Sequence, residues 1–222
     1  MPGQTVLFDA YGTLFDVHSA VRRAGADLGS LADPISQLWR VKQLEYSWTQ
    51  TLIGHFEDFW TLTERGLDFA LARHAIVDPG VRARLLDAYR TLDAYADVPP
   101  ALRALKRAGH RTGIFTNGTR AMVDAAIMAA GIGDLLDHVV TIEPVGAYKP
   151  QPAVYAHALA EAGRSRPDDI LFVSSNRWDV AGAVAFGFRT VWANRTGLPD
   201  EYPGLAPMTT VADLGPLPAL AA

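Results

Sequence analysis

Three charged side chains follow short apolar runs of the sequence and are the first candidates for chemistry. Asp9 ends the run in FDAYGTLFDV, Lys149 lies in EPVGAYKP, and Asp179 lies in SSNRWD. A carboxylate can act as a nucleophile or as a general base, and a neighbouring ammonium group favours its ionised form. Two carboxylates and one ammonium group would form a candidate catalytic centre if the fold brings them together.

Hydroxyl and amide groups follow the same apolar runs. Thr13 comes after the first run, Thr116-Asn117-Gly118 after the second, and Ser174-Ser175-Asn176 after the fourth. Each group alone has an ordinary structural explanation, such as a turn or a helix N-cap. With Lys149 after the third run, all four loops carry charged or polar groups, and a binding or catalytic site explains them better than chance does.

Several other candidates also have a structural explanation. Arg40, in LWRVKQLEYSW, is of a type that often lies along apolar surface with its charged end in water. A lysine before proline is usually solvated. Four apolar or aromatic side chains would by default pack in the core: Tyr11, Leu44, Phe59 and Trp178. At this point both explanations stay open.

The elements that must position these residues alternate along the chain. Short runs rich in Val, Ile and Phe predict buried strands at 5–8, 112–115, 139–142, 170–173 and 190–192. Periodic segments bounded by Pro and Gly predict helices at 98–107, 122–130 and 153–162. This alternation predicts an α/β fold with a doubly wound, mostly parallel, Rossmann-like sheet, whose ligand site lies beyond the carboxyl ends of the strands.

The interval after the first strand breaks the alternation. It contains three stretches with apolar residues at three- and four-residue steps, which predict helices that each bury one face. We therefore expect a core domain of residues 1–16 and 94–222 and a helical cap domain of residues 17–93. The tail, 205–222, predicts one edge strand or a surface helix.

Composition excludes several classes of protein. The 222 residues carry a net charge of −4, so no basic face is expected for a nucleic acid. We expect no membrane span and no secretory signal. The chain has no cysteine, which is compatible with the cytoplasm, and its six histidines show no spacing typical of a zinc site.

The order and spacing of FDAYGTLFDV, LWRVKQLEYSW, TNG, YKP and SSNRWD resemble the L-2-haloacid dehalogenases of the haloacid dehalogenase superfamily, over nearly the whole chain. The phosphatases of that superfamily carry a second Asp two positions after the nucleophile, where this chain has Tyr11, and a further carboxylate for Mg²⁺ in the last loop, where it has Ser174-Ser175-Asn176. Halide leaves as an anion and needs neither group. Tyr11 therefore favours a dehalogenase over a phosphatase.

The resemblance implies hydrolytic, metal-independent dehalogenation of short L-2-haloalkanoic acids to D-2-hydroxyalkanoic acids through an ester on Asp9, with no cofactor. It implies catalytic roles for Asp9, Thr13, Arg40, Lys149, Ser174, Asn176 and Asp179. We expect Asp179, held by Ser174 and Asn176, to position or activate the hydrolytic water. The expected substrate-binding residues are Tyr11, Arg40, Leu44, Phe59, Thr116, Asn117, Tyr155 and Trp178, with halide received by Arg40 and Asn117.

The expected partners are a 2-haloacid, halide ion and a second copy of the chain in a homodimer. Two alternatives stay open: a Mg²⁺-dependent small-molecule phosphatase of the same superfamily, and a non-catalytic carboxylate-binding protein.

Overall fold

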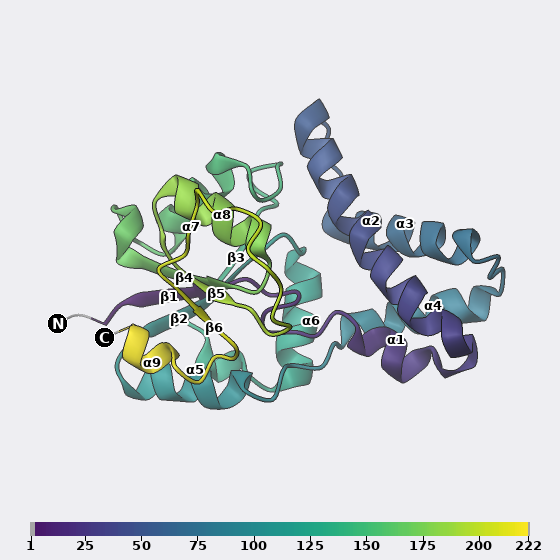
Figure 1. Ribbon diagram of the computed structural model, residues 1–222, viewed down its shortest axis with the longest axis horizontal. Helices are drawn as coiled ribbons and strands as arrows, with labels where there is room; N and C mark the ends of the chain where they lie inside the picture. Colours follow the sequence, from purple (N-terminus) through teal and green to yellow (C-terminus); the bar gives the residue numbers. More distant parts are fainter. Residues whose placement is uncertain (1–2, 222) are drawn as a thin grey trace.

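A six-stranded parallel sheet forms the centre of the computed structural model, which describes residues 3–221 (Figure 1). The strands, in chain order, are β1 (Thr5–Phe8), β2 (Arg111–Thr116), β3 (His138–Thr141), β4 (Ile170–Ser174), β5 (Arg189–Ala193) and β6 (Thr209–Val211). In space they lie in the order β3-β2-β1-β4-β5-β6. The strand order therefore reverses between β1 and β4, and a ligand site is expected at this point.

The central strands are buried on both faces. Every residue of β1 and β4 is buried, in agreement with their continuous apolar sequences. Helices α5 (Val98–Arg107) and α6 (Arg120–Ala130) lie on one side of the sheet, and α7 (Pro152–Glu161) and α8 (Arg177–Phe186) on the other (Figure 1). The doubly wound α/β fold predicted from the sequence is confirmed.

Helix boundaries agree with the expected ones to within a few residues. The predicted helix 98–107 coincides with α5, whereas α6 begins two residues before its predicted start. The Thr119 side chain accepts a hydrogen bond from the Met122 amide and so caps α6 at its N-terminus. The tail contains both a strand, β6, and a short helix, α9 (Leu217–Leu220), where one element was expected.

A helical insertion, here called the cap, lies at one end of the sheet (Figure 1). It contains α1 (Ser19–Ala24), a 3-10 helix (Ala26–Leu31), α2 (Ala32–Ile53), α3 (Phe59–Arg73) and α4 (Pro79–Arg90). The three predicted helices correspond to α2, α3 and α4, and α1 is additional. Asp58 and Asp78 accept hydrogen bonds from backbone amides at the starts of α3 and α4.

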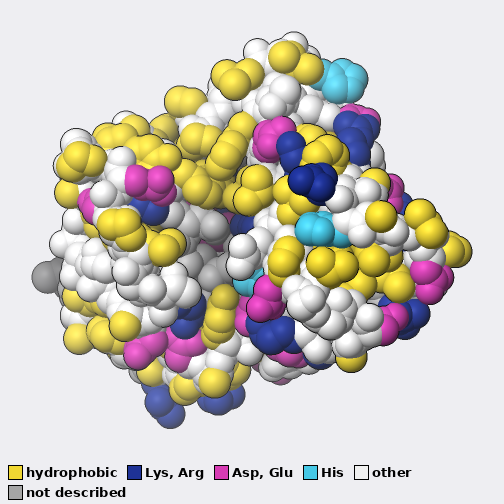
Figure 2. Space-filling view, turned by 45° about the vertical axis from the view of Figure 1, so that its right-hand side comes forward, with side chains coloured by type: hydrophobic (Ala, Val, Ile, Leu, Met, Phe, Trp, Pro, Cys, Tyr) yellow, Lys and Arg dark blue, Asp and Glu magenta, His cyan; other side chains and the backbone are white. Residues whose placement is uncertain are grey.

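The two chain segments that join cap and core run side by side. The Asp16 amide donates to the Asp93 carbonyl at 2.8 Å, and the Tyr95 amide donates to the Leu14 carbonyl at 3.0 Å. Figure 2 shows charged side chains of both signs scattered over one face of the molecule, with hydrophobic side chains between them. No described helix is long and apolar enough to cross a membrane.

Candidate active site

Asp9 lies directly after β1, at the point where the strand order reverses. Its Oδ2 accepts hydrogen bonds from Asn176 Nδ2 at 2.7 Å and from Thr13 Oγ1 at 3.1 Å. Its Oδ1 lies 3.3 Å from the ammonium nitrogen of Lys149. The residue is only 6% exposed. Three donors from three separate loops therefore fix the orientation of this carboxylate.

Lys149 is completely buried, and its ammonium group has three oxygen partners. Besides Asp9, Nζ donates to Asp179 Oδ2 at 2.9 Å and to the Phe115 carbonyl at 2.7 Å. Nζ also lies 4.0 Å from the centre of the Phe115 ring. Because a buried charge needs such partners, the ammonium group is held as a fixed positive charge between the two carboxylates.

Asp179 lies in the first turn of α8 and is fully buried. Its Oδ1 accepts a hydrogen bond from the Tyr155 hydroxyl at 2.8 Å. Burial raises the pKa of Asp179 to about 6, an effect that Lys149 opposes and the charge of Asp9 reinforces. A Cβ atom at Gly182 would collide with the Tyr155 hydroxyl, so a glycine at this position lets the tyrosine reach α8.

The expectation that Ser174 and Asn176 hold Asp179 is wrong. The Asn176 side chain turns to Asp9 and to the Tyr11 carbonyl, and Ser174 Oγ accepts from the Asn176 amide at 3.1 Å. The Asp179 carboxylate accepts hydrogen bonds from Lys149 and Tyr155 instead. Ser174 shapes the loop that presents Asn176.

Arg40 brings a positive charge from α2 in the cap. One guanidinium nitrogen donates to the Tyr11 carbonyl at 3.0 Å, and another donates to Gln43 Oε1 at 2.7 Å. The Gln43 amide in turn donates to Thr63 Oγ1 at 2.7 Å and to the Tyr89 hydroxyl at 3.1 Å. Gln43 is buried but was not predicted as a site residue. Its spacing of three from Arg40, one helical turn, was the available indication.

A small cavity lies between Asp9 on the core side and Arg40 on the cap side. We call it the catalytic cavity, and its volume is about 10 Å³. It is lined by Asp9, Tyr11, Arg40, Leu44, Phe59, Thr116, Asn117 and Trp178. Seven of the eight predicted substrate-binding residues therefore line the same space as the predicted nucleophile. Tyr155 does not line it, because Asp179 is its partner.

Two polar side chains of the cavity wall are already partly engaged. Asn117 Oδ1 accepts from the Lys149 amide at 3.0 Å, which leaves the Asn117 amide nitrogen to face a ligand. Thr116 Oγ1 accepts from the Gly118 amide at 3.0 Å and keeps its own proton for donation. Burial raises the pKa of Tyr11 well above its usual value, so its phenol stays neutral. Within residues 3–221, no group of three or more His, Cys, Asp or Glu side chains is arranged to hold a metal ion.

Fold and site together define a capped, doubly wound α/β protein with a carboxylate–lysine centre beneath its cap. The chain belongs to the haloacid dehalogenase-like hydrolase family, whose model matches residues 4–187.

Proteins of known activity resemble it over nearly their full length. The chain is 44% identical to (S)-2-haloacid dehalogenase 1 of Pseudomonas sp. strain CBS-3, over 99% of this chain and 96% of that protein. It is 46% identical to (S)-2-haloacid dehalogenase 4A of Burkholderia cepacia, over 88% and 85%. The structure of L-2-haloacid dehalogenase from Xanthobacter autotrophicus with covalently bound chloropropionic acid superimposes with a TM-score of 0.87, at 34% identity, over 98% of this chain and 97% of that one.

Proposed function

We propose that this protein hydrolyses the carbon–halogen bond of short-chain L-2-haloalkanoic acids and releases D-2-hydroxyalkanoic acids. The observation that carries the proposal is the Asp9 carboxylate, which lines the catalytic cavity and is paired with buried Lys149. The similarity to (S)-2-haloacid dehalogenases over nearly the whole chain supports the same reaction.

In the first step, an oxygen of Asp9 attacks the α-carbon from the side opposite the halogen. A carbon–oxygen bond forms while the carbon–halogen bond breaks, and the halogen leaves with the electron pair as halide. The product is an ester between Asp9 and the substrate. Because the α-carbon is attacked once, its configuration inverts.

In the second step, water attacks the carbonyl carbon of the Asp9 ester. Asp179 is our candidate for the group that positions this water or accepts its proton. Esterification removes the negative charge of Asp9, which is one of the causes that raise the pKa of Asp179. Asp179 therefore becomes easier to ionise after the first step, when a base is needed. Hydrolysis restores the Asp9 carboxylate and frees the hydroxy acid and one proton.

The leaving halide and the substrate carboxylate need separate donors. We assign the halide to Arg40 and to the Asn117 amide, which line the catalytic cavity with Asp9. Such donors stabilise charge that develops in the transition state. The substrate carboxylate is assigned to the Thr116 hydroxyl and to backbone N–H groups near the start of α6. The Gly118 and Arg120 amides are not among these donors, because they already bond Thr116 and Glu143.

The apolar wall of the cavity would exclude water and limit the size of the alkyl group. Leu44, Phe59 and Trp178 supply this wall, together with the neutral ring of Tyr11. In such surroundings, charge interactions are stronger than in water. One extra methylene changes discrimination by only about 1–3 kcal/mol, so several short acids should be accepted.

Halide release from L-2-chloropropionate in the presence of EDTA tests the function. We expect equal amounts of halide and D-lactate, and no turnover of the D-substrate at a comparable rate. Absence of halide release from short chloro- and bromoacids would refute the proposal. Turnover of p-nitrophenyl phosphate that requires Mg²⁺ would instead favour the phosphatase.

Isotope labelling tests the covalent step. In a single turnover in H₂¹⁸O, the label should enter Asp9 and not the hydroxy acid, because water attacks the ester carbonyl. Label found directly in the product would mean that water attacks the α-carbon.

We also propose that the core and cap domains meet at 16/17 and 93/94. The protein is further proposed to form a homodimer and to lie in the cytoplasm. Exposed apolar side chains on the cap, at Ile53, Phe69 and Val77, offer a surface for a second copy. The mass in solution, measured by light scattering, tests the dimer, and cell fractionation tests the location.

A further inference from the structure

The catalytic cavity is too small for the substrate that the proposed function requires. A volume of about 10 Å³ is close to the least that holds one water molecule. A 2-haloacid carries a carboxylate, a halogen and an alkyl group, and the three together do not fit into this volume. Some side chain of the wall must therefore move before the substrate can reach Asp9.

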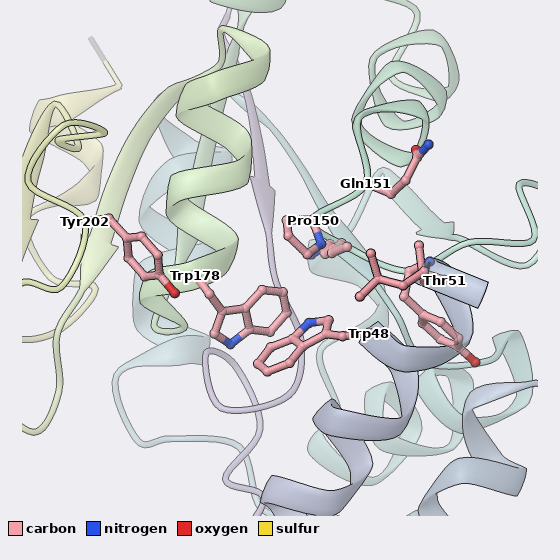
Figure 3. Close-up of a pocket in the computed structure, with 9 residues that line it drawn as sticks. Trp48, Thr51, Pro150, Gln151, Trp178 and Tyr202 are labelled. Carbon is pink, nitrogen blue, oxygen red and sulfur yellow. Dashed lines mark hydrogen bonds between the residues drawn. The ribbon is translucent and has the colours of Figure 1, made fainter. Parts of the chain in front are cut away.

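A second, larger cavity adjoins the first at Trp178. This outer cavity has a volume of about 390 Å³ and is lined by Trp48, Thr51, Leu52, Tyr148, Lys149, Pro150, Gln151, Trp178 and Tyr202 (Figure 3). Leu52 is 86% exposed, so the cavity reaches the surface of the described protein. Trp178 lines both cavities and is thus part of the wall between them.

One face of α2 runs from the first cavity into the second. Arg40, Leu44, Trp48 and Leu52 follow one another at four-residue spacing, which places them along one side of a helix. The first two line the catalytic cavity and the last two line the outer cavity. On this face of α2, Trp48 is therefore the first side chain beyond the catalytic cavity.

Trp48 and Trp178 meet across the boundary between cap and core. Their ring centres lie 5.4 Å apart with an interplanar angle of 80°, an edge-to-face contact (Figure 3). Trp48 Nε1 is buried without a hydrogen-bond partner in the described structure, whereas Trp39 Nε1 donates to the Thr63 carbonyl at 2.8 Å. Packing alone holds the Trp48 ring, so it can turn without breaking a hydrogen bond.

We infer that the outer cavity is the entry chamber for 2-haloacids and that the Trp48–Trp178 pair is the gate between it and Asp9. Trp48 is then a residue that determines the accepted chain length, in addition to the side chains that line the catalytic cavity. The inference rests on the proposed function, because it assumes that a haloacid must reach Asp9.

Substitution of Trp48 tests the gate. Removal of the ring in Trp48→Ala should raise the kcat/KM for a longer acid, L-2-chlorohexanoate, relative to that for L-2-chloropropionate by about tenfold or more. Trp48→Phe, which keeps an aromatic ring of smaller size, should give an intermediate ratio. It also provides the test if the alanine variant does not fold.

Trp60→Phe is the matched control, because Trp60 lies on α3 in the cap, stacked on the Arg90 guanidinium at 3.9 Å, and lines neither cavity. Its ratio of kcat/KM values should equal that of the unsubstituted protein. If both Trp48 variants change the kcat/KM values for the two substrates by the same factor, the gate is refuted while the dehalogenase function stands. If the unsubstituted protein releases no halide from either acid, the proposed function itself fails.

Discussion

On the core side of the site, charged side chains bond one another directly, whereas on the cap side the charged residue bonds only neutral groups. Asp9, Lys149 and Asp179 form a continuous buried chain of ion pairs. Arg40, in contrast, donates to the Tyr11 carbonyl and to the Gln43 amide oxygen. The core side and the cap side therefore differ in the free energy that is needed to displace their charged side chains.

This difference is consistent with different roles for the core side and the cap side. Separating a buried ion pair leaves an uncompensated charge, so the core side has one stable arrangement. Moving the cap side would instead break the two charge-assisted hydrogen bonds that Arg40 donates and the aromatic contact between Trp48 and Trp178. In the proposed mechanism, the bond-forming steps belong to the core side, and admission of substrate and reception of halide belong to the cap side.

Removal of the nucleophile should have the largest effect. Asp9→Asn keeps the shape of the side chain but removes the charge that attacks carbon, so halide release should fall by roughly 10⁴-fold or more. An ion-selective electrode measures the rate. Substrate binding, followed by calorimetry, should persist. A variant that keeps most of its activity would show that the core side does not supply the nucleophile.

Loss of the buried lysine should affect both activity and stability. Lys149→Met leaves two buried carboxylates without their cation, which should destabilise the fold by about 3–5 kcal/mol. Halide release should fall by roughly 10²–10³-fold. Chemical denaturation gives the unfolding free energy.

A second substitution separates charge from packing at this position. In Lys149→Met combined with Asp179→Asn, one uncompensated charge is gone, so part of the lost stability should return. If the double variant is less stable than Lys149→Met alone, the ion-pair explanation of the core side is wrong.

The core side of the site could be predicted from the sequence because strand ends are easy to locate. Apolar runs locate β1 and β4, and the parallel sheet then brings their carboxyl ends to one edge. The sequence alone thus predicts that Asp9 and Asn176 lie at the same edge of the sheet. The partners of Asp179 could not, because the direction of a side chain in the first turn of a helix depends on how α8 packs.

The cap side was less accessible to prediction. Gln43 and Trp48 lie on a helix of mixed polar and apolar residues, where a glutamine is usually solvated and a tryptophan usually packs in a core. Their roles depend on which face of α2 meets the core, and this follows from the packing of α2 against α3 and not from local pattern. Leu44 was predicted through the family resemblance and not through its own spacing.

Asp179 should make both stability and activity depend on pH, an effect that belongs to the core side of the site. Because its pKa is raised to about 6 in the folded protein, the folded state binds this proton more tightly than the unfolded chain, where an Asp has a pKa near 3.9. The contribution of Asp179 to stability is therefore fully present below about pH 4 and is lost as the pH rises through 6. In the proposed mechanism, ester hydrolysis uses the ionised form of Asp179, so its rate should fall as the pH drops below 6.

Stability and activity should thus change in opposite directions over the same pH range. The midpoint of thermal unfolding, compared between the unsubstituted protein and Asp179→Asn, isolates the contribution of this carboxyl. The difference between the two proteins should change between pH 4 and 6 and be constant below pH 4. A difference that does not vary with pH would mean that the pKa of Asp179 is the same in the folded and the unfolded protein.

The smallest effect is expected from Gln43, which acts through Arg40. Gln43→Leu keeps the approximate volume but removes the oxygen that accepts from the guanidinium and the amide that bonds Thr63 and Tyr89. The loss of a positioning hydrogen bond is worth about 0.5–1.5 kcal/mol, roughly a 2- to 12-fold decrease in kcat. The decrease should be greater for chloro- than for bromoacids, because chloride is the poorer leaving group and depends more on a well-placed Arg40.

Gln50→Leu serves as the control, since Gln50 is also a buried glutamine of α2 but bonds Glu57 and lies outside both cavities. Its variant should lose stability without any change in the ratio of chloride to bromide rates. An equal loss for both halogens in Gln43→Leu would mean that Gln43 only stabilises the cap. A selective loss for chloride would mean that the cap side of the site requires a well-oriented guanidinium at Arg40, as its proposed role in receiving the halide predicts.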